Sequence, residues 1–220
     1  MKNLVVTGDS FCANSTLWPA VVAKELDLNL ICYTNGGGQP WWDARIWLQQ
    51  LDPETIANTK IIIFAHTNAE RVPTKNRNIG FIDHSKDPTN EIETAIHLYY
   101  KYIFDADFVN WAQEAWFSEI SKTYGHKTLV HLHCFPWSMK RSHLLSGINV
   151  SPCLTALSLN ELGAEKFALV NDIRPNHLNL HNNQQLGLQL SKIISSNQTG
   201  WQSLDTGKFH QKTTKWFDWD

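Results

Sequence analysis

The feature that most constrains the fold is a set of short apolar runs, each followed by glycine, proline or polar residues. They occupy residues 3–7, 28–35, 60–68, 127–135 and 168–170, and "IIIFA" within 60–68 is the clearest of them. Short runs made mainly of apolar residues are typical of strands that are buried on both faces of a parallel sheet. The chain is therefore predicted to contain several buried strands.

Helical patterns separate these runs. An apolar stripe at residues 17–26 follows Thr16, a candidate N-cap, and a shorter helix is expected at 43–51. Residues 90–124 predict two helices, or one that bends near 105–107, and 182–194 form an amphipathic segment. Strands that alternate with helices predict an α/β class fold, a three-layer α/β/α sandwich with a mostly parallel sheet.

The length of 220 residues suits one domain, expected at 1–198, with a C-terminal tail at 199–220 that mixes aromatic and acidic residues. That tail is a candidate for docking a protein partner. A formal net charge of −2 without a basic run argues against nucleic acid as a partner. No apolar stretch approaches the roughly 20 residues of a membrane span, and no leader is visible, so a cytoplasmic location is expected.

Polar residues follow the predicted strands at their C-terminal ends. Ser10 follows the first run, Gly36–Gly38 follow the second, Asn68 ends the third, and the loop with Asp172 and His177 follows the last. Ligands of open parallel sheets bind in the crevice at this edge. These four groups are therefore expected to meet in one crevice.

Their chemistry is that of acyl transfer. A serine hydroxyl becomes a useful nucleophile when a histidine accepts its proton, and an acid on the other ring nitrogen fixes the histidine tautomer. Asp172 and His177 flank Pro175, so a tight turn could bring them together. The N–H groups of Ser10 and of a glycine, with the Asn68 amide, would stabilise the developing oxyanion.

Four segments together carry a resemblance to a known family. "VVTGDSFCA", "NGGGQPWWDARIWL", "IIIFAHTNAER" and "NDIRPNHLNLHNNQQLGLQL" resemble the SGNH hydrolases, also called the GDSL esterase/lipase superfamily. The resemblance spans residue 4 to about 195 and implies a flavodoxin-like SGNH hydrolase fold. It also implies a serine esterase that needs neither a metal nor an organic cofactor.

The same resemblance implies a role for each matching residue. Ser10 would be the nucleophile, His177 the base and Asp172 its partner, while Gly38 and Asn68 would complete the oxyanion hole. Gly37 fits the glycine role nearly as well as Gly38. His177 is preferred over His181 because Asn182 and Gly187 then stand at the offsets where the family has small or turn residues.

The sequence departs from the family pattern at three places. His66-Thr67-Asn68-Ala69 replaces the usual Gly-x-Asn-Asp, Arg174 occupies the usual acid position before His177, and Phe11 replaces a leucine. The leading hypothesis is hydrolysis of a small-molecule or glycan ester, with a short acyl group such as acetyl on a carbohydrate. The alternative is a non-catalytic SGNH-like module that binds a glycan or a protein.

Two further groups of residues have competing interpretations. Trp41 and Trp42 follow the glycine run, so one of them, with Trp41 as the candidate, is expected to line a substrate subsite and the other to pack in the core. His131 and His133 would share one face of a strand while Cys134 points to the other face. No third ligand can be placed beside the two histidines, and no metal site is predicted.

Overall fold

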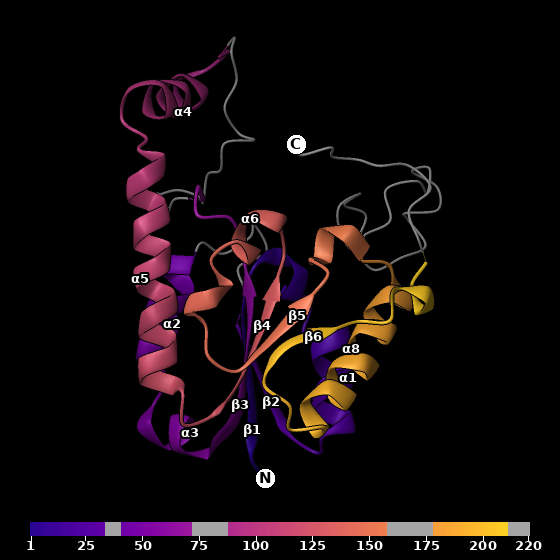
Figure 1. Cartoon of the computed structure of the whole chain (residues 1–220). Helices are drawn as coiled ribbons and strands as arrows, with labels where there is room; N and C mark the ends of the chain where they lie inside the picture. Colours follow the sequence, from indigo (N-terminus) through magenta and orange to yellow (C-terminus); the bar gives the residue numbers. More distant parts are fainter. Residues whose placement is uncertain (34–40, 72–87, 158–177, 211–220) are drawn as a thin grey trace.

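The computed structural model describes residues 1–33, 41–71, 88–157 and 178–210 and contains a six-stranded sheet whose strands are all parallel (Figure 1). The strand order is β2-β1-β3-β4-β5-β6. The strands are β1 (Asn3–Gly8), β2 (Asn29–Tyr33), β3 (Thr59–His66), β4 (Thr128–His133), β5 (Ile148–Ser151) and β6 (Gly200–Ser203).

Helices cover both faces of this sheet, so the predicted three-layer α/β fold is confirmed (Figure 1). One face carries α1 and α8, and the other carries α2 and α5. The helices are α1 (Trp18–Glu25), α2 (Trp41–Gln50), α3 (Pro53–Asn58), α4 (Glu91–Tyr102), α5 (Ala106–Tyr124), α6 (Pro136–Met139) and α8 (Leu180–Ser195).

The two helical layers explain why the central strands are apolar without interruption. In β1, Leu4 and Val6 belong to the core under α1 and α8, whereas Val5 belongs to the core under α2 and α5, and all three are fully buried. Successive side chains of a strand point to opposite faces. A strand that is covered on both faces therefore buries its side chains on both, and apolar residues are favoured throughout.

The order of the first five strands is that of flavodoxin-like doubly wound sheets, in which the order reverses between β1 and β3. In such sheets the reversal opens a crevice beyond the carboxyl ends of the two strands, where ligands bind. Ser10 and Asn68 follow the ends of these two strands. The topology therefore indicates that a ligand site lies at this edge of the sheet.

Close packing between α1 and α8 depends on Gly187. A Cβ at this position would lie 2.5 Å from the Cβ of Val21 and 3.1 Å from the carbonyl oxygen of Trp18. A side chain would push the two helices apart, and glycine allows α8 to lie against α1. The contact at Gly187 holds α8 at a fixed position relative to α1.

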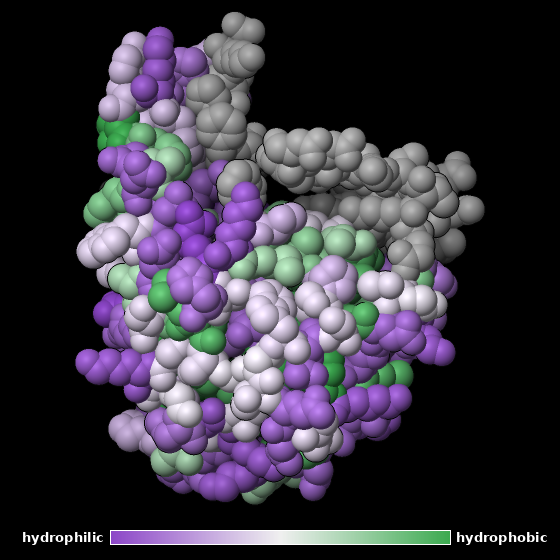
Figure 2. Space-filling model, in the orientation of Figure 1, coloured by the Kyte–Doolittle hydropathy of each residue, from purple (hydrophilic) through white to green (hydrophobic). Residues whose placement is uncertain are grey.

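Helix α4 and the N-terminal part of α5 form an arm that extends beyond the sheet, while the rest of α5 packs on the sheet (Figure 1). Residues 103–105 separate them, and Asn90 and Asp105 cap the two helices through their side chains. The expected break near 105–107 is thus confirmed. Exposed apolar side chains occur on the arm, and Figure 2 shows them mixed with polar ones on the face in view.

Several boundaries differ from the sequence predictions. Thr16 does not cap α1, which has Leu17 at its N-cap, because the N–H and hydroxyl of Thr16 both donate to Asn14 Oδ1. The short strands β5 and β6 were not anticipated. Since β6 pairs with β5 at residues 200–203, the α/β unit extends past residue 198 into the expected tail. Residues 211–220 and the expected strand at 168–170 lie outside the described residues.

Among the described residues, no helix combines the length and the apolar character needed to cross a bilayer.

Candidate functional site

Ser10 lies at the carboxyl end of β1, where the chain turns sharply. Gly8 has a φ of +133°, and a Cβ there would lie 2.1 Å from the carbonyl oxygen of Ala65. That close approach lets the Asp9 N–H donate to the same oxygen at 2.8 Å, which holds the end of β1 against β3. The chain then enters a short 3-10 helix at Ser10–Cys12.

A buried carboxylate lies beside the Ser10 hydroxyl. The Ser10 hydroxyl donates to Asp9 Oδ1 at 2.9 Å, and the same oxygen accepts the Phe11 N–H at 3.3 Å. Asp9 is fully buried, and its Oδ2 lies 3.9 Å from Nη1 of Arg71. Asp9 thus shapes the turn that presents Ser10, and Arg71 offsets its charge.

Asn68 lies at the carboxyl end of the neighbouring strand. Gly8 pairs with Ala65 in the register of β1 and β3, so Ser10 and Asn68 follow this pair by two and three residues. The carbonyl oxygen of Asn68 accepts the Arg71 N–H at 3.3 Å and closes a turn. The structure therefore brings these two predicted residues to adjacent strand ends, as the sequence indicated.

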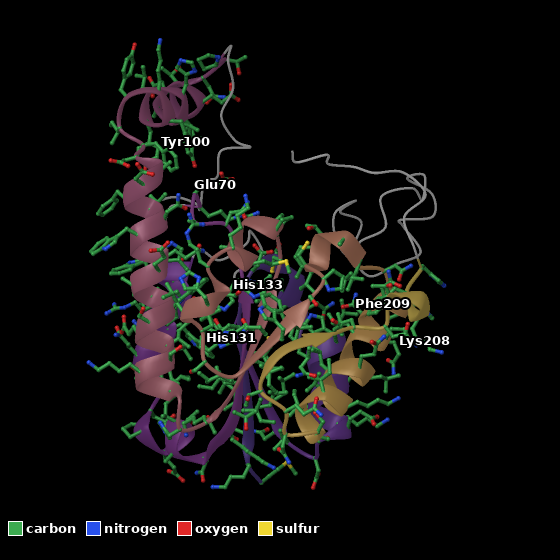
Figure 3. The ribbon with its side chains drawn as sticks, in the orientation of Figure 1. Glu70, Tyr100, His131, His133, Lys208 and Phe209 are labelled. Atoms are coloured by element: carbon green, nitrogen blue, oxygen red, sulfur yellow. The ribbon has the colours of Figure 1, made fainter. Side chains whose placement is uncertain are left out.

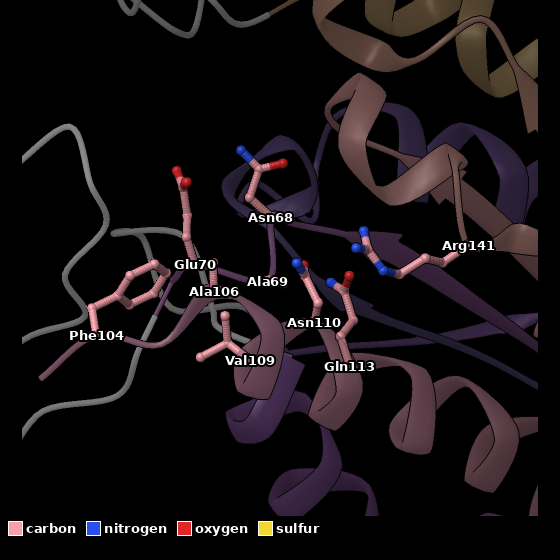
Figure 4. Close-up of a pocket in the computed structure, with 9 residues that line it drawn as sticks. All are labelled: Asn68, Ala69, Glu70, Phe104, Ala106, Val109, Asn110, Gln113 and Arg141. Atoms are coloured by element: carbon pink, nitrogen blue, oxygen red, sulfur yellow. The ribbon is translucent and has the colours of Figure 1, made fainter. Parts of the chain in front are cut away.

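Glu70 is a residue of this site that the sequence analysis missed. Burial raises the pKa of the Glu70 carboxyl, and a hydrogen bond from the Asn68 side chain and the charge of Arg71 partly offset that rise. Figure 4 shows the amide nitrogen of Asn68 on the side of Glu70 and the amide oxygen on the opposite side. The acid that the family has directly after its asparagine stands here one position later, and that shift was the available signal.

The helical arm holds the turn that carries Asn68 and Glu70. The Tyr100 hydroxyl of α4 donates to the Glu70 carbonyl oxygen at 3.1 Å, and Figure 3 labels both residues. Gln113 of α5 donates through Nε2 to the carbonyl oxygen of Thr67 at 3.0 Å. Two helices far from β3 in sequence thus fix the backbone on both sides of Asn68.

Trp41 lies at the start of α2 and borders the same strand end. It lines a small cavity together with Gly8, Ala65 and Trp116, and packs against the core under α2 and α5. Its ring meets that of Trp42 edge-on at 5.7 Å, and Trp42 is 39% exposed. Trp41 is thus near Ser10 in the fold and is also a packing residue.

The remaining predicted site residues, Gly37, Gly38, Asp172 and His177, lie outside the described residues. The described chain resumes at Leu178, which is buried in the core, and Asn179 caps α8. Helix α8 leads into β6, which is parallel to the other strands, so the C-terminal end of α8 lies at the edge where the strands begin. The N-terminal end of α8 therefore lies at the opposite edge, where β1 and β3 end. The rejected candidate His181 donates through Nε2 to the carbonyl oxygen of Lys208 and stacks on His210.

The buried side chains of His66, His131 and His133 form a network in the core next to α5. His131 Nε2 is 2.9 Å from the Ser146 carbonyl oxygen, so that nitrogen carries the proton and Nδ1 accepts. His66 Nε2 is 3.0 Å from this Nδ1 and is therefore the donor. The His133 ring lies 5.6 Å from that of His66, and Figure 3 labels His131 and His133.

This network bears on the metal question that the sequence raised. The structure places His66 beside His131 and His133, whereas Cys134 points to the opposite core, as expected. The nitrogens of His66 and His131 that face each other share a proton, which leaves no room for an ion between them. Within the described part of the chain, no group of three or more His, Cys, Asp or Glu residues could hold a metal.

Comparison with known proteins gave no relatives. No family model, curated protein or solved structure matches this chain.

Proposed function

We propose that this protein is a serine ester hydrolase with the catalytic plan of the SGNH family. The observation that carries the proposal is the arrangement of Ser10 and Asn68 at the carboxyl ends of β1 and β3, where the strand order of the sheet reverses. The turn at Gly8, which Asp9 ties to Ala65, and the support of the Asn68 turn by α4 and α5 are consistent with a site that holds its groups in fixed positions.

In this proposal Ser10 attacks the ester carbonyl and His177 accepts its proton. The hydrogen bond that the Ser10 hydroxyl donates to Asp9 must break before the hydroxyl proton can pass to His177. His177 then protonates the leaving alcohol. Water next attacks the acyl-enzyme while His177 takes its proton, and His177 returns that proton to Ser10 as the carboxylic acid leaves. Asp172 orients His177. The position of the α8 N-terminus supports the role of His177, because this residue directly precedes Leu178.

The oxyanion would be stabilised by the Ser10 N–H, a glycine N–H at Gly38 or Gly37, and the Asn68 amide. An amide nitrogen has two N–H groups, so Asn68 can donate one to Glu70 and the other to the oxyanion. Glu70 would therefore act as a positioning residue for Asn68.

The direct test is hydrolysis of p-nitrophenyl esters of increasing acyl length by the full chain. Release of nitrophenol from the acetyl ester, decreasing with acyl length, supports an esterase for short acyl groups. No release at any length supports the alternative, a binding module for a glycan or a protein.

The Asn68 role makes a quantitative prediction. Asn68→Ala is expected to lower kcat about 10²- to 10³-fold with little change in KM, because the lost donor acts mainly in the transition state. Glu70→Gln keeps an acceptor for the Asn68 amide and is expected to lower kcat about tenfold or less. Steady-state kinetics on p-nitrophenyl acetate measures both variants, with thermal melting to verify folding. An Asn68→Ala variant within threefold of the wild type would remove Asn68 from the oxyanion hole.

A further inference from the structure

A cavity of about 190 Å³ adjoins Asn68 between the turn after β3 and the first turns of α5 (Figure 4). Its wall has an apolar part and a polar part. Phe104, Ala106 and Val109 form most of the apolar part, and Asn110, Gln113 and Arg141 form the polar part. Asn68 and Glu70 line the cavity as well, so it shares Asn68 with the proposed oxyanion hole.

The polar wall offers both donors and acceptors of hydrogen bonds. Gln113 is 1% exposed, and its Nε2 is committed to Thr67, so the amide oxygen is the atom that can accept from a ligand. Arg141 pairs through Nε with Glu114 at 3.0 Å, which balances its charge and leaves the ends of the guanidinium as donors. Asn110 supplies one donor group and one acceptor.

These features describe the ligand. A hydroxyl group both donates and accepts, so several hydroxyls on one small body match the mixed wall. Glu114 balances the charge of Arg141, and Glu70 adds a carboxylate to the wall, so the cavity does not favour an anionic ligand. The volume is below the roughly 300–1,000 Å³ of pockets that hold drug-sized ligands, which limits the occupant to one small unit. The apolar wall with Phe104 suits the C–H face of a ring.

We propose that this cavity binds a single sugar ring, the alcohol part of the ester whose carbonyl reaches Ser10 past Asn68. The position of the ester rests on the proposed function, whereas binding of the sugar itself does not. The site thereby defines the substrate class as an acylated carbohydrate in which the sugar ring held by the cavity carries the ester that reacts with Ser10.

Saturation-transfer NMR on the full chain tests the binding step. The probes are the methyl glycosides of glucose, galactose, mannose, N-acetylglucosamine, xylose and rhamnose. At least one is expected to give a signal that Val109→Trp, which fills the cavity, reduces at least about fivefold. Ala115→Trp is the matched control, because it adds the same side chain to an exposed position of α5 outside the cavity. Asn110→Leu, which removes the amide with little change in size, gives a second test if Val109→Trp fails to fold.

The kinetic arm compares two esters. One is the acetyl ester of the glycoside that binds, and the other is p-nitrophenyl acetate, which lacks a sugar. Val109→Trp is expected to lower kcat/KM for both, and the loss for the sugar ester is expected to be at least about tenfold larger. Ala115→Trp leaves the ratio of the two unchanged.

The outcomes separate the two proposals. Ser10-dependent hydrolysis of p-nitrophenyl acetate, with no glycoside signal or with a signal that both cavity variants retain, overturns the sugar site and leaves the esterase intact. A glycoside signal lost in the cavity variants, without hydrolysis of any ester, supports the sugar site and overturns the esterase.

Discussion

Replacing Ser10 with alanine is expected to reduce hydrolysis of p-nitrophenyl acetate at least about 10³-fold. The acyl-enzyme cannot form without the hydroxyl, and only the rate supplied by binding and oxyanion stabilisation would remain. Stability is expected to change little by comparison, because Asp9 Oδ1 keeps its bond from the Phe11 N–H when it loses the bond from Ser10.

The control for this variant is Ser15→Ala, which removes a hydroxyl from an exposed position in the following loop. Its activity is expected to equal that of the wild type. Initial rates are measured for both variants at equal concentrations of folded protein. A Ser10→Ala variant that keeps more than a tenth of the wild-type rate would mean that hydrolysis does not pass through Ser10.

The second large effect is a loss of stability in mild acid that arises from the buried histidines. Burial lowers the pKa of His131 to about 3 and that of His133 to about 4, and burial also lowers the pKa of His66. In the unfolded chain these groups titrate near 6.5, so below that pH the unfolded state binds protons that the folded state excludes. Stability from these histidines is present above about pH 6.5 and is lost as the pH falls toward 4.

The expected size is about 2 kcal/mol for each histidine between pH 7 and 5, or about 4 kcal/mol for His131 and His133 together. That is a large part of the roughly 5–15 kcal/mol by which a domain is stable. His133→Gln removes one titrating group while keeping polar atoms for Ser138 and Asn149. It should therefore reduce the loss between pH 7 and 5 by about 2 kcal/mol.

Urea unfolding followed by tryptophan fluorescence at pH 7 and pH 5 measures this effect, with the exposed His126→Gln as the matched variant outside the network. Equal stability of the wild type at the two pH values would contradict the neutral, buried state of the histidines. An equal loss in the wild type and in His133→Gln would exclude His133 as a source of that loss.

The architecture could be predicted from sequence because two-sided burial leaves a strong signal. Val5 between Leu4 and Val6, and the run at Ile61–Ile63, have no polar position on either face, and only central parallel strands require that. The edge strand β6 carries no such signal, because three of its four residues are exposed. Its Trp201 stacks on His133 at 5.6 Å, a contact that no local pattern reveals.

The candidate site was predictable to the extent that it depends on strand ends. Ser10 and Asn68 could be placed because a parallel sheet brings its carboxyl ends to one edge. Glu70 was missed because its role depends on a turn that reverses the chain at Asn68. The cavity beside Asn68 was missed because its wall combines three segments that are far apart in the sequence. They are the turn after β3, the start of α5 with Phe104 and Gln113, and Arg141.

The role of Ser10 as nucleophile is tested most directly by labelling the full chain with a fluorophosphonate, followed by peptide mapping. The probe reacts with a serine whose hydroxyl is activated by a neighbouring base. We expect a single tag on the peptide that contains Gly8, Asp9 and Ser10, and we expect His177→Ala to abolish it. Absence of a tag, or a tag on another serine while Ser10 stays unmodified, would contradict the role of Ser10 as nucleophile.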